Sequence, residues 1–264
     1  MDVTLLVLGD VVGRPGRDAL RRHLKPCRQE RHVDFVVANG ENAAGGAGIT
    51  PETADELFAS GVDVITAGDH VWDKKEIVPY IGRQPRLLRP FNFPDTAAGR
   101  GWVVADAANG TKVAVCSLLG RVFLNQPADN PFAAADRFLE AVEGQARVTV
   151  IDLHAEATSE KVALGWHVDG RASLVVGTHT HVPTADEHVY PNGTAYVTDL
   201  GMTGPYASVL GRRHDRVLHR FLTGMPSVYD VAEGDVRICG VLAVVDDKTG
   251  RAKSIERVCI RDEA

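Results

Sequence analysis

Short apolar runs alternate with amphipathic stretches along the first two-thirds of the chain. Continuous runs rich in β-branched residues are typical of strands that are buried on both faces of a sheet. Five runs have this character, at residues 3–8, 33–38, 62–67, 148–153 and 174–176. Between them lie helix signals such as Thr50-Pro51-Glu52, which places a capping hydroxyl, a proline and an acid at a helix start. The alternation predicts an α/β fold with a largely parallel sheet.

Two further helices and two antiparallel strand pairs complete the predicted layout. The helices are predicted at residues 131–144 and 211–222. The strand pairs are predicted at residues 102–107 with 111–118 and 236–245 with 252–260. Asn109-Gly110, a strong hairpin signal, lies between the strands of the first pair. We expect the second pair to add edge strands or to form a second sheet.

Composition limits the classes of protein that this fold can serve. Hydrophobic residues make up 44% of the chain, which is enough for a sizeable core. The formal net charge is −6 and no tract of five or more basic residues occurs, so a long nucleic acid is not an expected partner. The sequence contains no linker, repeat or low-complexity tract, so we expect residues 1–264 to form a single domain.

The cysteines and the N-terminal sequence favour a cytoplasmic protein. Cys27, Cys116, Cys239 and Cys259 are far apart and form no Cys-x-x-Cys motif, which argues against a zinc ribbon or a thioredoxin-type site. Thiols within apolar runs suit a reducing cytoplasm. MDVTLLVLGD has only a short apolar run and no basic leader, so we interpret it as a strand and not a signal peptide. No run approaches the roughly 20 apolar residues of a membrane span, so we expect no membrane partner.

Carboxylates, an amide and imidazoles follow the five predicted parallel strands. In chain order they are Asp10, then Glu41 and Asn42, then Asp69 and His70, then His154, and finally His179 and His181. In open parallel sheets, ligands bind at the carboxyl ends of the strands, so these side chains are expected to gather at one edge. One aspartate at a strand end usually caps a helix, and one histidine is usually structural. Five such endings together predict a shared metal site.

The number and type of these donors suit a site for two metal ions. A mononuclear catalytic site needs three protein ligands, and this set is large enough for two ions with one bridging carboxylate. Mixed oxygen and imidazole donors suit iron, manganese, zinc or nickel. Two ions roughly 3.5–4 Å apart form a clamp for in-line displacement at phosphorus. The expected reaction is therefore metal-dependent cleavage of a phosphate ester.

Five sequence blocks resemble the YmdB-like branch of the calcineurin-like metallophosphoesterases. The blocks are NGENAAGG, HVWDK, HAEATSEK, GTHTHVPTAD and TDLGMTGP, and the resemblance runs from Gly9 to the final strands. Together they are far more specific than a Gly-Asp-x-x-Gly motif alone. The resemblance implies a four-layer α/β/β/α sandwich of the metallophosphoesterase type. It also implies a bacterial 2′,3′-cyclic-nucleotide phosphodiesterase, a hydrolase of small phosphodiesters, with 3′,5′-cyclic nucleotides as further candidate substrates.

The resemblance also implies roles for the residues at the strand ends. One ion is held by Asp10, Glu41 and His181, and the other by Asp69, His154 and His179, with Glu41 bridging. A hydroxide between the ions attacks phosphorus, and His70 either protonates the leaving oxygen or only contacts the phosphate. The implied cofactors are two divalent or trivalent ions, iron first, with manganese or zinc as alternatives. The implied assembly is a homo-oligomer, a dimer or a tetramer.

Two departures from the wider superfamily bear on this chemistry. The superfamily begins with Asp-x-His, whereas this chain has Asp10-Val-Val, and we interpret Asn42 as the replacement donor. The superfamily usually has asparagine where this chain has Asp69. With two divalent ions, the three carboxylates leave a formal charge of +1, and a hydroxide brings it to zero. We expect Asp69 to favour a more oxidised metal or a weaker grip on phosphate dianions.

Other polar residues near these blocks have two interpretations each. Glu156 and Glu160 either orient a metal ligand or are acids of a first helical turn. Asp199 either orients a ligand or shapes a turn, and Asp73 and Lys74 are interpreted as stabilising a helix start.

Three other functions remain open at this point: a phosphomonoesterase, a nuclease acting on RNA ends, and a regulatory metal-binding protein that acts through a protein partner. A P-loop enzyme is not expected, because no Gly-x-x-x-x-Gly-Lys-[Ser/Thr] motif is present.

Overall fold

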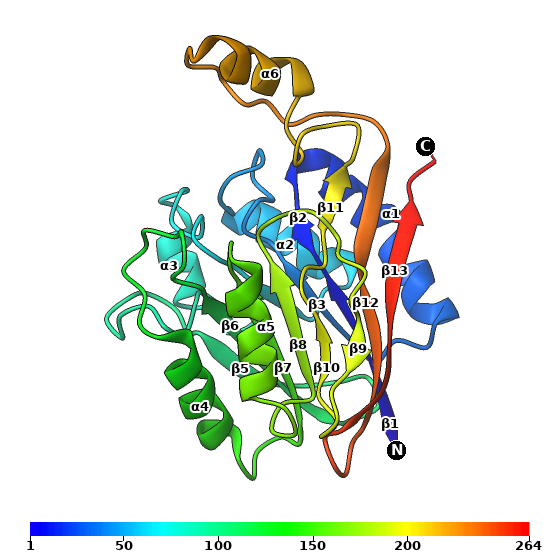
Figure 1. Cartoon of the computed structure of the whole chain (residues 1–264). Coiled ribbons are helices and arrows are strands. Elements are labelled where there is room, and N and C mark those ends of the chain that lie inside the picture. The colour runs from blue at the N-terminus through cyan, green and yellow to red at the C-terminus, as the bar shows by residue number, and fades with distance from the viewer. Residues whose placement is uncertain (264) are drawn as a thin grey trace.

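Two β-sheets lie face to face, with helices on both outer sides, in the computed structural model, which describes residues 1–263 (Figure 1). In this part of the chain the first sheet has seven strands in the order β2-β11-β12-β1-β3-β4, with β13 paired to β12. Their bounds are β1 Asp2–Leu8, β2 Asp10–Val11, β3 Phe35–Asn39, β4 Val64–Thr66, β11 Met202–Pro205, β12 Val236–Asp246 and β13 Ala252–Arg261.

The second sheet has six strands within the described residues, in the order β5-β6-β7-β8-β10-β9. Their bounds are β5 Trp102–Asp106, β6 Lys112–Leu119, β7 Val148–His154, β8 Leu174–Thr178, β9 His188–Val189 and β10 Ala195–Val197. The helices are α1 Gly13–Glu30, α2 Pro51–Ser60, α3 Ile77–Ile81, α4 Pro131–Val142, α5 Thr158–His167 and α6 His214–Thr223. The first three pack on the first sheet, and α4 and α5 pack on the second.

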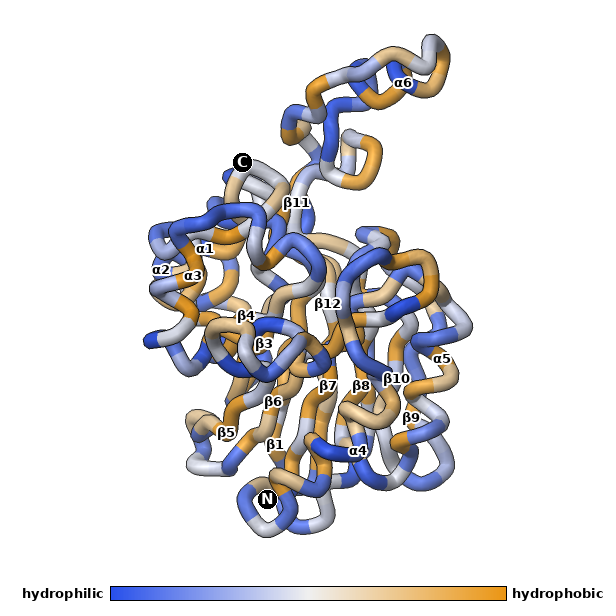
Figure 2. Tube along the Cα trace, turned by 90° about the vertical axis from the view of Figure 1, so that its left-hand side faces the viewer, coloured by the Kyte–Doolittle hydropathy of each residue, from blue (hydrophilic) through white to orange (hydrophobic). Residues whose placement is uncertain are grey.

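Apolar residues fill all three spaces between the layers. Along β1, Val3, Leu5 and Val7 face the second sheet, whereas Leu6 and Leu8 face the helices. Side chains of a strand alternate between its two faces, so a strand with apolar neighbours on both sides is apolar throughout. Figure 2 shows this as hydrophobic colour along the inner strands. The four-layer α/β/β/α sandwich is therefore confirmed.

Local signals for helices and hairpins were largely correct. Thr50 caps α2 and forms a capping box with Thr53, and Pro51 occupies the first turn. β5 and β6 pair antiparallel around the Asn109-Gly110 turn. The helix predicted from residue 211 begins instead at His214, because Gly211 has a φ of 87° and lies before the helix.

The last strand pair differs from expectation. β12 and β13 are antiparallel, as predicted. However, β12 also pairs with β1 along its length, from Asp246 opposite Asp2 to Gly240 opposite Leu8, so it lies inside the first sheet. The expectation that both strands would be edge strands or a separate sheet is wrong for β12. Only long-range pairing, which has no local signature, places it there.

The five parallel strands also belong to two sheets and not to one. β1, β3 and β4 are in the first sheet, and β7 and β8 are in the second. Their carboxyl ends lie at the same end of the sandwich, where the Ser117 hydroxyl of β6 donates to the Ala67 carbonyl beyond β4 at 2.7 Å. The predicted strand-end residues therefore face one another across the gap between two sheets.

The segment around α6 projects from the sandwich in both views (Figures 1 and 2). Val217 is the buried residue of this helix. The other large apolar side chains of the projecting segment are exposed: Leu218, Phe221, Leu222, Met225 and Val228. No helix within residues 1–263 combines the length and the hydropathy needed to cross a bilayer.

Candidate metal centre

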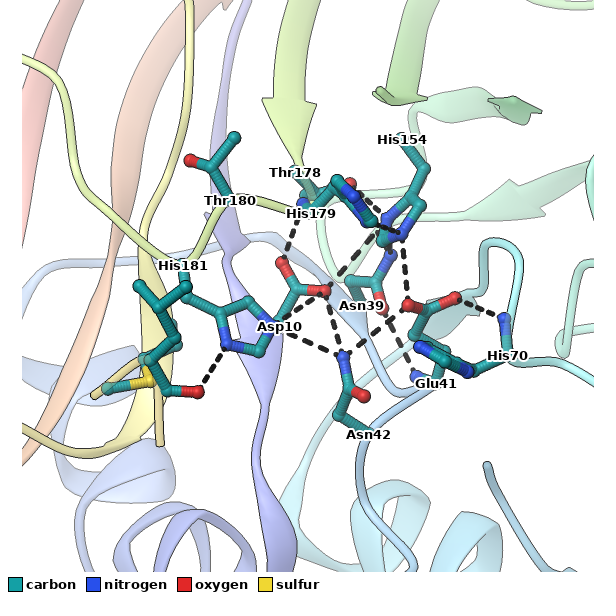
Figure 3. A network of polar contacts seen from close by, with 12 residues as sticks. Asp10, Asn39, Glu41, Asn42, His70, His154, Thr178, His179, Thr180 and His181 are labelled. Atoms are coloured by element: carbon teal, nitrogen blue, oxygen red, sulfur yellow. Dashed lines mark hydrogen bonds and ion pairs between the residues drawn. The ribbon is translucent and has the colours of Figure 1, made fainter. Parts of the chain in front are cut away.

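Seven of the predicted residues converge between the ends of the two sheets, and Figure 3 labels all of them except Asp69. The first sheet contributes residues that directly follow β1, β3 and β4, whereas the second contributes the end of β7 and the turn after β8. The carboxylates and the amide come from the first sheet, and the imidazoles come from the second. The seven are Asp10, Glu41, Asn42, Asp69, His154, His179 and His181.

Four of these residues point donor atoms at one position. Candidate ligand atoms of Glu41, Asp69, His154 and His179 all lie within 4.8 Å of one another. Nε2 of His154 is 2.9 Å from Oε1 of Glu41, 3.1 Å from Oδ1 of Asp69 and 2.9 Å from Nδ1 of His179. Nδ1 of His179 is 3.5 Å from Oδ1 of Asp69.

The other three residues form a second group that shares Glu41. Oδ1 of Asp10 is 3.6 Å from Nε2 of His181. Nδ2 of Asn42 lies 3.3 Å from each of these atoms and 3.4 Å from Oε1 of Glu41. Nδ2 of Asn42 thus faces the other donor atoms of this group. A 180° turn of the amide plane would present the side-chain oxygen to a cation instead.

The spacing of the donors fits metal ions. Imidazole and carboxylate donors lie about 2.0–2.2 Å from ions such as zinc, so neighbouring donors of one ion are separated by roughly 2.9–3.5 Å. The four distances just given for the four-residue group fall in this range. Nε2 of His154 and Nδ1 of His179 face each other at 2.9 Å, an arrangement that requires either a proton or a cation between them. The donor chemistry and the spacing both fit a metal centre.

Each candidate histidine ligand is oriented by a partner on its outer nitrogen. Nδ1 of His181 donates to the Leu210 carbonyl at 3.0 Å, and Nε2 of His179 lies 3.1 Å from the carboxylate of Glu156. Nδ1 of His154 lies 2.9 Å from Oγ1 of Thr178. These contacts leave the inward nitrogen of each ring free for a cation, as is usual for metal-bound histidines.

A buried carboxylate supports His154 from behind. Thr178 donates its hydroxyl to Asp152 at 2.7 Å, so its oxygen accepts a hydrogen bond from Nδ1–H of His154. Burial raises the pKa of Asp152 to about 6, although hydrogen bonds from Thr66 and Thr178 oppose this. The sequence analysis missed this network. Asp152 lies within a predicted apolar strand, and an acid at that position was the only sequence signal for the network.

The candidate ligands shift each other's proton affinities. Burial raises the pKa of Asp10, but the hydrogen bond and charge of His181 outweigh it and lower this pKa well below its usual range. Hydrogen bonds from His154 and His179 outweigh burial in the same way and lower the pKa of Asp69. Burial lowers the pKa values of His154 and His181, but the neighbouring carboxylates outweigh it and raise both. Without metal, protons on the imidazoles therefore offset the buried carboxylates.

His70 lies at the rim of the cluster. Its backbone amide donates to Oε2 of Glu41 at 3.3 Å, and its side chain is 42% exposed. Nδ1 is 2.8 Å from the carboxylate of Asp73, and Nε2 is 3.9 Å from Asp69. Asp73 was interpreted as stabilising a helix start, but it instead orients the His70 ring. The His-x-x-Asp spacing, with the aspartate three residues on, was the available signal.

The two acids after His154 have different positions. Glu156 reaches the outer nitrogen of His179, which fits the interpretation that it orients a ligand. Glu160 is buried away from the cluster, where its carboxylate accepts the backbone amides of Arg121 and Val122. Glu160 is therefore no partner of a candidate ligand. It is an acid of the first turn of α5, as the alternative interpretation held, and it fixes the loop after β6.

The layers and the donor set place the protein in the class of metallophosphoesterase-type sandwiches. The crystal structure of a hypothetical protein from Thermus thermophilus superposes with a TM-score of 0.91 at 40% identity, covering 98% of this chain and 100% of that chain. The crystal structure of a Mycoplasma pneumoniae protein, described as a novel phosphatase, superposes with a TM-score of 0.91 at 31% identity, covering 99% of this chain and 94% of that chain.

Sequence comparison identifies the family within this class. The model of the YmdB-like protein family matches residues 6–258. A Bacillus subtilis (strain 168) protein named 2′,3′-cyclic-nucleotide 2′-phosphodiesterase is 48% identical over 259 residues, covering 98% of this chain and 97% of that protein. The chain belongs to the YmdB-like family, and the resemblance seen in the five sequence blocks is confirmed.

Proposed function

We propose that this protein is a metal-dependent hydrolase that cleaves 2′,3′-cyclic nucleotides at the P–O2′ bond. The observation that carries the proposal is the pair of donor groups that share Glu41 between the two sheets. The name of the Bacillus subtilis relative, 48% identical over nearly the whole chain, supports the substrate class.

Two metal ions are proposed, one for each donor group. Asp69, His154 and His179 would hold one ion, and Asp10, Asn42 and His181 would hold the other, with Glu41 between them. Iron is the first candidate, and manganese or zinc are alternatives with similar preferences for oxygen and imidazole donors. When bound, the two ions supply Lewis acidity to the phosphoryl group and lower the pKa of a water molecule.

The protein's own residues then supply charge balance and a proton. Water adds across the P–O2′ bond, so phosphorus gains an oxygen and O2′ must gain a proton. His70 is proposed as the source of that proton, because Asp73 engages Nδ1 and leaves Nε2 directed toward the rim of the site. The same Nε2 proton would alternatively form a hydrogen bond to a phosphate oxygen, and the two roles differ in their dependence on the leaving group.

A phosphomonoesterase is the second candidate function. The Mycoplasma pneumoniae relative with the same fold is described as a phosphatase, which favours this alternative. The carboxylate of Asp69 favours the diesterase, because an extra negative charge in the donor set opposes the binding of a phosphate dianion.

The experiment compares substrates on protein of known metal content. We expect metal-dependent release of the 3′-nucleotide from 2′,3′-cyclic AMP, slower turnover of 3′,5′-cyclic AMP, and little release of phosphate from 3′-AMP. Faster release of phosphate from 3′-AMP than hydrolysis of the cyclic diester would favour the phosphatase. No metal-dependent turnover of any of the three would contradict both functions.

We further propose a homo-oligomer that assembles through the projecting α6 segment. Phe221 and Leu222 are 81% and 82% exposed, and a helix of this length is marginal in water without a packing partner. Isolated monomers rarely expose apolar patches of this kind. Light scattering should give a dimer or tetramer for the wild type and a monomer for Phe221→Asp. A single domain over residues 1–264 and a cytoplasmic location remain predictions.

A further inference from the structure

The turn that carries His179 and His181 has an unfavourable backbone conformation. The angle φ is 97° at His179 and 64° at His181, a region that residues other than glycine rarely adopt. Such a backbone persists only where the surrounding structure over-determines it. Thr180 lies between the two histidines, and in Figure 3 its side chain points away from the donor cluster. The support for the turn therefore comes from the side opposite the candidate ligands.

Asp199, in the loop between β10 and β11, holds Thr180 in place. The amide and the hydroxyl of Thr180 both donate to Oδ2 of Asp199, at 3.2 and 2.7 Å. Oδ1 of Asp199 accepts the amide of Gly201 at 2.8 Å. The Asp199 amide donates to Oγ1 of Thr184 at 3.0 Å, and the Asp199 carbonyl accepts the Thr184 amide at 3.0 Å. Asp199 is thus itself fixed at both its side chain and its backbone.

Lys161 of α5 completes the support. Its Nζ donates to Oδ2 of Asp199 at 2.8 Å, and both side chains are 1% exposed. The methylene chain of Lys161 also packs over Gly177, which lies in β8 two residues before His179. A Cβ atom at Gly177 would lie 2.8 Å from Cδ of Lys161 and 1.8 Å from the Thr198 carbonyl oxygen. Lys161 therefore contacts the end of β8, which leads into the turn, and reaches Thr180 in the turn through Asp199.

A buried ion pair is a weak means of stabilising a fold, because the desolvation of two charges offsets their attraction. The contacts of this pair converge instead on the residue between two candidate metal ligands. We propose that Lys161, acting through Asp199, is a positioning residue that directs the imidazole of His179 toward one metal position and that of His181 toward the other. This inference rests on the proposed metal-dependent function.

Titration of the metal-free full chain with Co²⁺, followed by visible absorption, tests the inference without substrate. Lys161→Met and Thr180→Val should each weaken Co²⁺ binding roughly 10–100-fold, the range found for outer partners of metal ligands. Val142→Ala is the matched control, because Val142 is 2% exposed in the apolar layer between α4 and the second sheet and lies away from the turn. It should lower the Tm and leave the Co²⁺ affinity unchanged.

Thr180→Val and one further variant keep the test decisive. Thr180→Val removes a hydrogen bond without leaving a buried charge unpaired, so it decides the outcome if Lys161→Met fails to fold. The double variant Lys161→Met with Asp199→Asn removes both charges. If the pair acts as one unit, the double variant should bind Co²⁺ no more weakly than the weaker binder of the two single variants, Lys161→Met and Asp199→Asn.

Co²⁺ affinities within twofold of the wild type in Thr180→Val and in any folded Lys161→Met protein would overturn the inference. The inference would also be overturned if Val142→Ala lost as much Co²⁺ affinity as Lys161→Met or Thr180→Val at the same Tm. A wild-type protein that binds no Co²⁺ would remove the metal site and this role together. A wild-type protein that binds Co²⁺ but hydrolyses nothing would contradict the proposed function alone.

Discussion

Replacing Glu41 by glutamine removes one negative charge from the middle of the site and keeps the shape of the side chain. Glu41 is fully buried. Its Oε1 lies 2.9 Å from Nε2 of His154 and 3.4 Å from Nδ2 of Asn42, so it borders both donor groups. A loss at this position should therefore weaken both metal positions.

The size of the effect follows from the charge that is lost. At an effective dielectric constant of about 20, two unit charges about 4 Å apart interact by about 4 kcal/mol. A divalent ion carries two units, so one unit per ion is a conservative count. About 4 kcal/mol corresponds to roughly a thousandfold in affinity. Glu41→Gln should therefore bind metal at both positions about 10³-fold more weakly and lose turnover by at least a similar factor at limiting metal.

Metal analysis and hydrolysis of 2′,3′-cyclic AMP should be measured on the same preparations. Glu156→Gln is the matched control, because Glu156 is half exposed and contacts only the outer nitrogen of His179 among the candidate ligands. We expect it to lose at most roughly 10–100-fold, the range found for outer partners of metal ligands, and only at the metal position that His179 borders. Glu41→Gln protein that retains two ions per chain and turnover within tenfold of the wild type would refute the role of Glu41.

Four further predictions concern single groups of the site. His179→Ala and His181→Ala should each empty one metal position before the other, and metal titrations with equal losses at both would contradict the two-group assignment. Asp69→Asn should change metal content and raise activity toward monoesters relative to diesters. If neither property changes, the charge of Asp69 is unimportant. His70→Ala should slow cyclic AMP hydrolysis roughly 10²–10⁴-fold while sparing metal content and a p-nitrophenyl ester that needs no proton. Because the pKa values of His154 and His181 are raised, protons compete with metal, so metal affinity should fall from about pH 8 to about pH 6, and a flat profile would contradict this competition.

The strand ends were predictable because the signal is local. An apolar run that stops at Asp10, Asp69 or His154 identifies both the strand and the residue beyond its end. The carboxyl ends of parallel strands lie at one edge of a sheet, and here the two sheets pack with these edges at the same end of the sandwich. The candidate ligands could therefore be predicted from the strand pattern, although the pattern alone does not show how the parallel strands divide between the two sheets.

The supporting contacts were not predictable, because they join segments that are distant in the sequence. Lysine side chains are usually exposed to solvent, yet Nζ of Lys161 is buried against Asp199, 38 residues away. Asp152 reads as part of a buried strand, and its partner Thr178 lies on the neighbouring strand. In both cases burial of the charge depends on packing between elements, and the hydrophobic pattern of either element alone does not contain it.

Anomalous diffraction from crystals of metal-loaded protein tests the central claim most directly. Two peaks per chain are expected. One should lie among Glu41, Asp69, His154 and His179, and the other among Glu41, Asp10, Asn42 and His181. A single peak, or peaks outside these two groups, would contradict a two-ion centre that shares Glu41.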